Sequence, residues 1–435
     1  MTTNKEELSE DKALPEKEYS LKNLEDCVQK LYDYRDHYFE RNTIDDASKR
    51  KNDIDIQLKN TLDELDKFQD VIQKEDKPMF YYLKGKSLNV TADFDKNALD
   101  LLSKAVKLDP KLVDAWNELG ECYWKNDNIK EAKNCFNGAL AQRRNKISLR
   151  NLSMVYRQEC ATTKEQQIEN IQKGVSYAKE ALDLDLNDGN SWAVLGNAHL
   201  SNYFLISQNP RTLKMCMSAY NQAKRDIIAR NNPDLHYNVG IALKYEEEYL
   251  AALNSFSRAQ ALDPTWDFPK IKEERLLKYL ESVNELVATN GRMKGRKLQQ
   301  LIQSIDNKPS IQDLLTVSIS SLKPGINKNV ILCGKVVCSV QNEDSVPFTF
   351  CLIDKESTCI MVSVYNLAEG KGVIIGDLVA IPEPFYSEVH VIYKDKTYNF
   401  KKIRVESPLS LVVNGKKLNR NQQAGTRMTT FKKSS

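Results

Sequence analysis

Over most of the first 290 residues, apolar side chains recur at the three- and four-residue spacing of a helix. The pattern first appears near residue 19, where one apolar face is formed by Leu21, Leu24, Val28, Leu31 and Tyr32. Such a face predicts amphipathic helices that bury one side, and we expect them over 18–76. The preceding stretch, 1–17, is rich in Glu and Lys. It has too few apolar residues to pack, so we expect a disordered tail.

From about residue 310 the apolar period changes to two, which indicates strands. The expected strands are Val330–Val337, Phe348–Asp354, Cys359–Tyr365, Gly376–Ile381 and Thr397–Val405. Five strands with a break between the third and the fourth fit an OB barrel. We therefore expect an OB-fold domain over 309–415 and a disordered basic tail over 416–435.

The helical region contains an internal repeat. Its clearest copy has Trp, Leu, Gly and Tyr at fixed spacing, followed by Ala, Phe and Ala: Trp116, Leu119, Gly120, Tyr123, Ala132, Phe136 and Ala139. This is the signature of the tetratricopeptide repeat (TPR), a helix pair of about 34 residues. Further copies are centred near Gly85, Ser153, Gly196 and Gly240. A single pair cannot bury its apolar faces, so we expect stacked repeats with a capping helix over 77–290. The predicted fold class is an α-helical TPR solenoid followed by a small all-β OB-fold barrel.

The first helix of each TPR pair carries a second stripe, at repeat positions 2, 5, 9 and 12, which we expect to line a peptide-binding groove. An asparagine amide can hold a peptide backbone, an arginine can fork a carboxylate, and an acidic residue attracts a cation. The mixed charge suits a ligand that carries both signs. The alternative is a solvated helix face at each position. The candidate contacts are Lys86, Asn117, Glu121, Arg150, Arg157, Asn197, Asp234 and Tyr237.

A short basic run follows the repeats. It concentrates positive charge in a chain whose net charge is only +3, through Arg292, Lys294, Arg296 and Lys297. One interpretation is a solvated linker over 291–308. The other is contact with the phosphates of RNA.

Nothing in the sequence is arranged as an active site, and we expect no enzyme, cofactor or metal. The nucleotide-binding, zinc-protease and hydrolase motifs are missing, and His37, His199, His236 and His390 share no ligand spacing. The nine cysteines form no C-x-x-C pair and are interpreted as reduced, buried thiols. We expect no membrane segment and no secretion signal, which predicts the cytosol or nucleus, and we expect a monomer.

Aromatic side chains on the predicted strands leave a further alternative open. Phe348, Phe350 and Tyr365 could stack the bases of a single-stranded nucleic acid, as OB barrels often do. At strand spacing they could equally face the barrel core, which is the interpretation that we favour.

Several segments resemble one family, the tetratricopeptide repeat protein five (Strap) family. They span nearly the whole chain past residue 20, and they include Leu101–Asp109 (LLSKAVKLD), Asn145–Met154 (NKISLRNLSM), Val346–Phe350 (VPFTF), Gly376–Pro384 (GDLVAIPEP) and Val412–Lys416 (VVNGK). The resemblance implies a TPR and OB protein with two roles. One is recognition of the N-terminal peptide of nascent tubulin at the ribosome, which leads through an mRNA-decay adaptor to decay of the tubulin message. The other is a nuclear stress-response cofactor within an acetyltransferase coactivator complex.

The resemblance also implies site residues. The groove arginine of the family falls on Arg157 and its groove aspartate on Asp234. A further acidic contact lies in the segment Thr265–Phe268, where Asp267 is a neighbour of the matching position. The β-tubulin peptide begins with Met, Arg and Glu, so it carries both charge signs. The implied location is cytoplasmic and nuclear.

Overall fold

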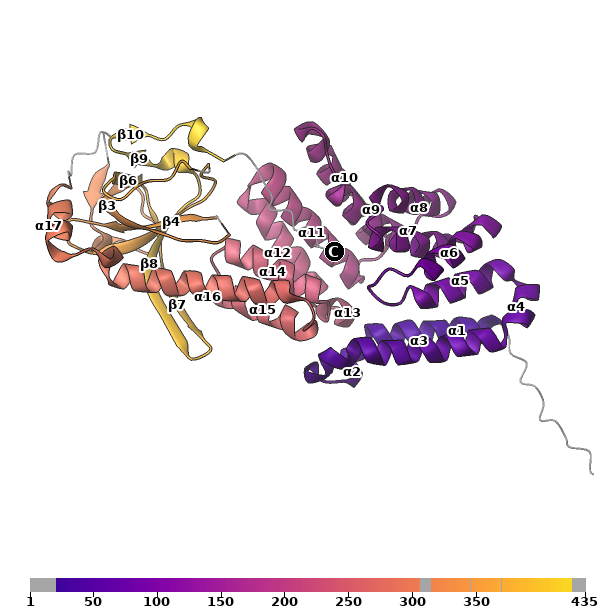
Figure 1. The fold of residues 1–435 in the computed structure, drawn as a ribbon. Coiled ribbons are helices and arrows are strands. Elements are labelled where there is room, and N and C mark those ends of the chain that lie inside the picture. The colour runs from indigo at the N-terminus through magenta and orange to yellow at the C-terminus, as the bar shows by residue number, and fades with distance from the viewer. Residues whose placement is uncertain (1–20, 306–313, 345, 369, 425–435) are drawn as a thin grey trace, which may run out of the picture. The chain divides into compact units, whose positions relative to one another are not determined.

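The computed structural model describes residues 21–305, 314–344, 346–368 and 370–424. Two compact units are formed: the first comprises Met1–Ala198 and Arg225–Ile228, and the second His199–Lys224 and Ala229–Ser435. Figure 1 shows helices in the first unit, and helices together with a β-barrel in the second. The expected tail over 1–17 lies outside the described residues.

The first unit begins with helices where the apolar face predicts them. They are α1 (Leu21–Asp36), α2 (Tyr38–Arg41), α3 (Arg50–Lys67) and α4 (Gln69–Glu75). Leu24, Val28 and Leu65 are buried in one cluster with the first helices of the repeats. The apolar face of α1 therefore packs against the repeats.

Helix pairs follow in the same unit. Their members are α5 (Lys77–Leu88) with α6 (Lys96–Leu108), α7 (Val113–Lys125) with α8 (Ile129–Gln142), and α9 (Lys146–Gln158) with α10 (Lys164–Leu184). The repeat glycines allow each pair to approach closely. A Cβ at Gly120 would lie 2.5 Å from the Phe136 ring, and one at Gly85 would lie 2.7 Å from Leu102. These clashes explain why the motif requires glycine at this position, and the predicted TPR fold is confirmed.

The second unit continues the helical pattern. It contains a π-helical turn (Tyr203–Ser207), α12 (Pro210–Ala223), α14 (Pro233–Tyr245), α15 (Tyr249–Leu262) and α16 (Asp267–Ala288). Two further helices, α11 (Gly189–Asn202) and α13 (Ile227–Arg230), lie where the chain passes between the units. Gly240 repeats the close approach, since a Cβ there would lie 2.6 Å from the Phe256 ring. The expected capping helix is α16.

The remainder of the second unit is a β-sheet. Its strands are β1 (Leu315–Val317), β2 (Gly325–Ile326), β3 (Val330–Val340), β4 (Phe348–Ile353), β5 (Cys359–Val364), β6 (Leu378–Pro382), β7 (Phe385–Tyr393), β8 (Lys396–Val405), β9 (Val412–Val413) and β10 (Lys416–Lys417). The central order is β6-β3-β4-β5-β8-β7, with β5 and β8 parallel. Only Glu383 and Pro384 separate β6 from β7, so the two ends of this order are halves of one bent strand. The sheet thereby closes on itself, and the predicted OB fold is confirmed.

The structure extends the expected fourth strand. The alternating pattern predicts a strand only to Ile381, and it predicts no strand between Ile381 and Thr397. Instead, the chain bends at Glu383, where φ is 46°, and continues as β7. Proline at 384 cannot donate to a ladder, which interrupts the strand pattern at the bend.

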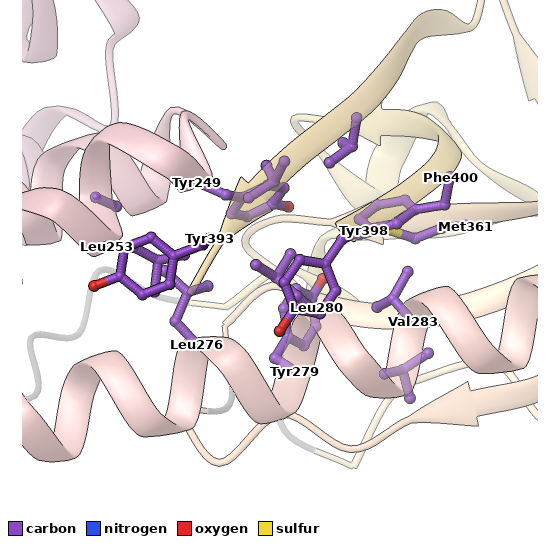
Figure 2. Close-up of a cluster of buried hydrophobic side chains, with 14 of the residues drawn as sticks. Tyr249, Leu253, Leu276, Tyr279, Leu280, Val283, Met361, Tyr393, Tyr398 and Phe400 are labelled. Carbon is purple, nitrogen blue, oxygen red and sulfur yellow. The ribbon is translucent and has the colours of Figure 1, made fainter. Parts of the chain in front are cut away.

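Repeats and barrel share one hydrophobic core within the second unit. Figure 2 shows Tyr249 and Leu253 of α15 and Leu276, Tyr279, Leu280 and Val283 of α16 around Met361, Tyr393, Tyr398 and Phe400 of the barrel strands. Tyr279 also makes a 3.0 Å hydrogen bond with the Thr349 hydroxyl. The capping helix thus packs on both α15 and the barrel strands.

Two expected boundaries differ from the structure. The run expected as a linker over 291–308 contains helix α17 (Gly295–Gln303), with Leu298, Leu301 and Ile302 packed on the shared core. The basic tail expected to be disordered from 416 begins with β10, which pairs with β9. Short polar segments carry little periodic signal, so the sequence pattern stops before the ordered chain does. Residues 425–435 lie outside the described part.

Candidate peptide-binding surface

The N-terminal helix α1 contacts the stripe residue Lys86 of the first repeat and Glu118 of the second. The Tyr32 hydroxyl of α1 donates to the Lys86 carbonyl at 2.9 Å and to the Glu118 carboxylate at 3.3 Å. The Lys86 ammonium lies over the Tyr32 ring, 4.8 Å from its centroid. Lys86 was expected to contact a peptide, and the structure shows it held by α1.

A polar network continues from this contact into α7. Asn89 donates to Glu118 at 2.7 Å and accepts from the Lys125 ammonium, which also lies 3.2 Å from Glu121. Burial and the neighbouring Glu121 carboxylate raise the pKa of Glu118 to about 7. Glu121 was expected to attract a ligand cation, and it already neighbours the Lys125 ammonium.

Asn117 faces the third repeat. It accepts a hydrogen bond from the Ser148 hydroxyl at 2.5 Å and donates to Asn145 at 3.3 Å. Asn145 is also the N-cap of α9, where it accepts from the Ser148 amide. Only 5% of Asn117 is exposed. Its amide therefore joins α7 to α9, a structural role in place of the expected hold on a peptide backbone.

The two arginines of the third repeat differ in their surroundings. Arg150 donates to Asp188 at 2.7 Å. Burial would raise the pKa of Asp188, but the Arg150 guanidinium holds it below its ordinary value. The Nε of Arg157 donates to the Ser153 carbonyl at 3.0 Å, and its stem lies on Gly174. The guanidinium of Arg157 is thus positioned by the helix pair α9 and α10, while that of Arg150 is engaged by an internal carboxylate.

Asn197 is partly exposed on α11, at the stripe position that the repeat motif predicts. In the second unit, Asp234 is exposed in the first turn of α14, where a negative charge also complements the helix dipole. Tyr237 is buried and packs on Trp266, with ring centroids 4.8 Å apart. Asp267 begins α16 and is exposed. Asp234 and Asp267 thus present carboxylates at the surface, and Tyr237 supports the turn between α15 and α16.

A loop of the barrel contacts the residue at the last stripe position of the fifth repeat. Asp344, between β3 and β4, pairs with Lys244 of α14, with Lys272 at 2.7 Å and with Arg275 at 3.4 Å. Burial opposes ionisation, yet Lys244 and Lys272 lower the pKa of Asp344 to about 2. Sequence reasoning did not find Asp344, because its partners are 69 to 100 residues away.

A second buried acid joins the repeats to the barrel. Glu247, at the turn after α14, pairs with Lys402 and accepts hydrogen bonds from Ser363 at 2.6 Å and Tyr365 at 3.0 Å. Glu247 has a positive φ of 62°. Asp127 occupies the matching turn of the second repeat with a similar φ of 57°, but its side chain is exposed. The acidic run at 246–248 was the available signal, but an acidic run usually indicates a solvated turn.

The basic run divides into one paired and three exposed cations. Arg292 forms two hydrogen bonds with Glu285, at 2.9 and 2.7 Å. Lys294, Arg296 and Lys297 are exposed at the start of α17. Their positive charge stands at the N-terminus of a helix, which already carries partial positive charge. This end of α17 can attract an anion.

The aromatic residues of the barrel are mostly interior. Phe350 and Tyr365 are 0% and 1% exposed, and the partly exposed Phe348 covers Gly372. The interpretation as barrel core is therefore supported, and these residues form no open platform for stacking bases.

Within the described residues, no helix is long and apolar enough to cross a membrane. The same ranges contain no group of three or more His, Cys, Asp or Glu side chains placed to hold a metal ion.

Helix pairs with the TPR glycine contacts, joined to a closed OB barrel, define a protein of the TPR–OB class. The family model "Tetratricopeptide repeat protein 5 OB fold domain" matches residues 313–427, and a tetratricopeptide repeat model matches 96–153. Tetratricopeptide repeat protein 5 of Homo sapiens is 42% identical over 419 residues, which are 93% of this chain and 95% of the human one. The Mus musculus protein is 42% identical over 424 residues, which cover 94% and 96%. The chain belongs to the tetratricopeptide repeat protein 5 family.

Solved TPR structures are similar to part of this chain. A thermophilic TPR protein of Thermus thermophilus is 18% identical, with a TM-score of 0.35, over 42% of this chain and 89% of that one. YrrB, described as a TPR protein with an unusual peptide-binding site, is 21% identical, with a TM-score of 0.31, over 47% of this chain and 96% of that one. Family membership and the repeats support an adaptor role for this chain.

Proposed function

We propose that the chain is a non-enzymatic adaptor that binds the N-terminal peptide of nascent tubulin at the ribosome and brings the mRNA-decay machinery to the translated message. Membership in the tetratricopeptide repeat protein 5 family over 93% of the chain carries this proposal. The resemblance described above attaches the role to that family. On this proposal the protein acts in the cytoplasm.

Arg157 and Asp234 supply the charges that such a peptide requires. Arg157 is held by α9 and α10, where it can fork the glutamate carboxylate of a Met-Arg-Glu peptide. Asp234 is exposed on α14, where it can attract the arginine. Asp267 is a further exposed carboxylate for the same cation.

Other candidates from the stripe are less suited to a ligand. Lys86, Asn117 and Arg150 are engaged by α1, Ser148 and Asp188. On this proposal these three residues hold the repeats in shape, and Arg157, Asp234 and Asp267 contact the peptide.

Exposed cations of α17 support a contact with the ribosome. Lys294, Arg296 and Lys297 are solvent-exposed within nine residues of α16, which is fixed to the barrel. Phosphate contacts of lysine and arginine supply affinity that depends on salt. We propose that this cluster binds ribosomal RNA while the repeats hold the peptide.

The direct test is a pull-down of the full chain on ribosomes that translate β-tubulin. We expect co-purification that a free Met-Arg-Glu-initiated peptide abolishes and that a peptide with glutamate replaced by lysine does not. Equal recovery of ribosomes that translate an unrelated protein, unaffected by either peptide, would remove the proposal.

A second candidate function is a nuclear stress-response cofactor that scaffolds a lysine acetyltransferase. The same family membership favours it, and the shared core of repeats and barrel gives a rigid platform for partners. Nuclear co-precipitation with an acetyltransferase complex that survives Arg157→Gln would support a separate surface for this role.

A further inference from the structure

Three cysteines meet on one face of the barrel sheet, under the capping helix. Cys338 of β3 and Cys351 of β4 are directly opposed partners in the antiparallel ladder. Cys359 of β5 is two residues from Met361, which is the partner of Cys351. The three belong to the core shared by α16 and the barrel, and the Cys351 thiol contacts both of the other sulfurs.

A β-bulge creates the direct opposition. The ladder pairs Val336 with Leu352 and then Cys338 with Cys351, so Val337 is the extra residue. In a regular register Val337 would face Cys351, and Cys338 would point to the other side of the sheet. The bulge thus brings two thiols opposite each other across neighbouring strands.

Opposed residues in an antiparallel pair have Cα atoms about 4.5–5.5 Å apart. A disulfide spans Cα separations of roughly 4.4–6.8 Å, so the pair Cys338 and Cys351 lies inside this range. The diagonal neighbours in a ladder are about 7–8 Å apart, which places Cys359 beyond it. The register therefore favours a disulfide between Cys338 and Cys351 over one that includes Cys359.

The two opposed thiols differ in access and in ionisation. Cys351 is 0% exposed and Cys338 is 8% exposed. A glycine covers the latter: a Cβ at Gly291, where φ is 69°, would lie 3.1 Å from the Cys338 sulfur. The hydrogen bond with Cys351 and the Arg292 cation lower the pKa of Cys338, whereas the pKa of Cys351 is raised. One thiol is thus suited to attack an oxidant and the other to resolve the product.

We propose that Cys338 and Cys351 form a reversible disulfide when the protein meets a peroxide. The Cys338 thiolate attacks one oxygen of hydrogen peroxide, the O–O bond breaks, and a sulfenic acid and hydroxide result; the hydroxide takes up the proton that the Cys338 thiol released and becomes one water. The Cys351 sulfur then attacks the sulfenic sulfur, the S–O bond breaks, and the hydroxide leaves with the thiol proton as a second water. Two thiols lose two electrons, and one peroxide becomes two waters. A dithiol reductant reverses the reaction.

The disulfide would cross-link the two strands of the β3–β4 hairpin, whose loop contacts α16. The loop between β3 and β4 carries Glu343 and Asp344, which pair with Arg275 and Lys272 of α16. A cross-link between residues 338 and 351 restricts this loop in the unfolded chain, which favours the folded hairpin. Oxidation would therefore stabilise the folded hairpin that carries this contact with the capping helix.

The test maps disulfides in the full chain with Cys160→Ser, which removes the exposed thiol. After graded hydrogen peroxide, non-reducing digestion and mass spectrometry should show one linked pair, Cys338–Cys351, with the loss of two thiols that dithiothreitol restores. Cys216→Ser, a buried cysteine of α12, should leave this product unchanged, and Cys338→Ser should abolish it. The oxidised protein should also melt several degrees higher than the reduced protein.

Other results would overturn the proposal. These are a pair that includes Cys359, a cross-link that appears only in denaturant, or thiols at 338 and 351 that persist while the rest of the chain is oxidised. Disulfide mapping in the Cys160→Ser variant shows whether Cys338 and Cys351 are linked without any substitution in the core. The test therefore does not depend on whether Cys338→Ser folds.

Discussion

At the scale of single residues, charge and burial decide which stripe positions are available to a ligand. Arg150 and Arg157 both lie on the stripe of the third repeat. Arg150 is paired with Asp188, whereas Arg157 packs on α10. Asp234 is exposed, while Tyr237, three residues later, is buried under Trp266. Repeat position therefore predicts the direction of a side chain, and its neighbours decide its role.

The first prediction concerns the charged peptide contacts. Arg157→Gln and Asp234→Asn should each weaken binding of a Met-Arg-Glu peptide at least tenfold, because removal of one partner from a desolvated ion pair costs about 2–5 kcal/mol. Titration calorimetry on the full chain measures the effect. Arg143→Gln and Asp183→Asn change exposed residues away from the stripe and should bind as wild type. If all four variants bind alike, the peptide does not use these residues.

A second prediction concerns Glu118. Its pKa is about 7 in the fold against an ordinary 4.5, so the folded protein holds this proton more tightly than the unfolded chain does. The stability due to this group is highest below pH 4.5 and falls as the pH rises to 7, by about 3 kcal/mol at most. Glu118→Gln should therefore raise the free energy of unfolding at pH 8 and change it little at pH 4.5.

Urea unfolding at several pH values measures that difference. Glu75→Gln, an exposed glutamate of α4, should show no such pH dependence. A Glu118→Gln variant with the same pH profile as wild type would mean that Glu118 is ionised at no cost in the folded protein.

At the scale of elements, two short segments are placed by contacts far away in the sequence. Helix α17 has an apolar face on the shared core and a basic N-terminus in solvent. The loop between β3 and β4 brings Asp344 to three cations of α14 and α16. Each segment is polar enough to be interpreted as a linker or loop from its sequence, and each is an organised part of the second unit.

The third prediction tests the basic end of α17. Reversal of charge at Lys294, Arg296 and Lys297 should abolish co-sedimentation with ribosomes at physiological salt, while binding of the free peptide is retained. Loss of the phosphate contacts should also flatten the salt dependence of the interaction. Charge reversal at Lys107, Lys111 and Lys130, exposed lysines of the repeats, is the matched control. Equal loss in both variants would indicate a general effect of net charge.

At the scale of the whole molecule, the last repeat and the barrel are continuous in their core. Tyr279 and Leu280 of α16 are buried against strands more than 60 residues later, and Glu247 is enclosed with Lys402 and Arg404. Such an arrangement predicts that α14–α16 and the barrel lose structure together.

The fourth prediction follows from Glu247. Glu247→Gln leaves the Lys402 ammonium buried without its carboxylate, which should lower the free energy of unfolding by about 3 kcal/mol. Hydrogen exchange should show faster exchange in α16 and in β5 and β8 together. Asp127→Asn alters the matching but exposed turn of the second repeat and should cost less than about 0.5 kcal/mol. Similar losses for both substitutions would contradict a special role for the buried pair.

The sequence by itself determined the local architecture. Trp116, Gly120 and Phe136 predict a TPR pair because the motif describes contacts within a single pair, and alternation along β3 and β4 predicts strands because its period is set by the backbone. Burial of Phe350 also followed from alternation. The family resemblance was visible for the same reason, since segments such as Gly376–Pro384 are continuous in the chain.

Only the tertiary structure decided what covers each face. Periodicity shows that a side of α16 is buried, but it does not show that the barrel rather than another repeat buries it. Partners such as Glu247 and Lys402 are 155 residues apart, and no local pattern connects them. No local pattern predicts the contact of Tyr32 with Lys86 or the ion pair of Asp344 with Lys244. Nor does one predict the bulge that places Cys338 opposite Cys351. Ion pairs and registers of this kind depend on three-dimensional proximity, which a single sequence does not encode as a period.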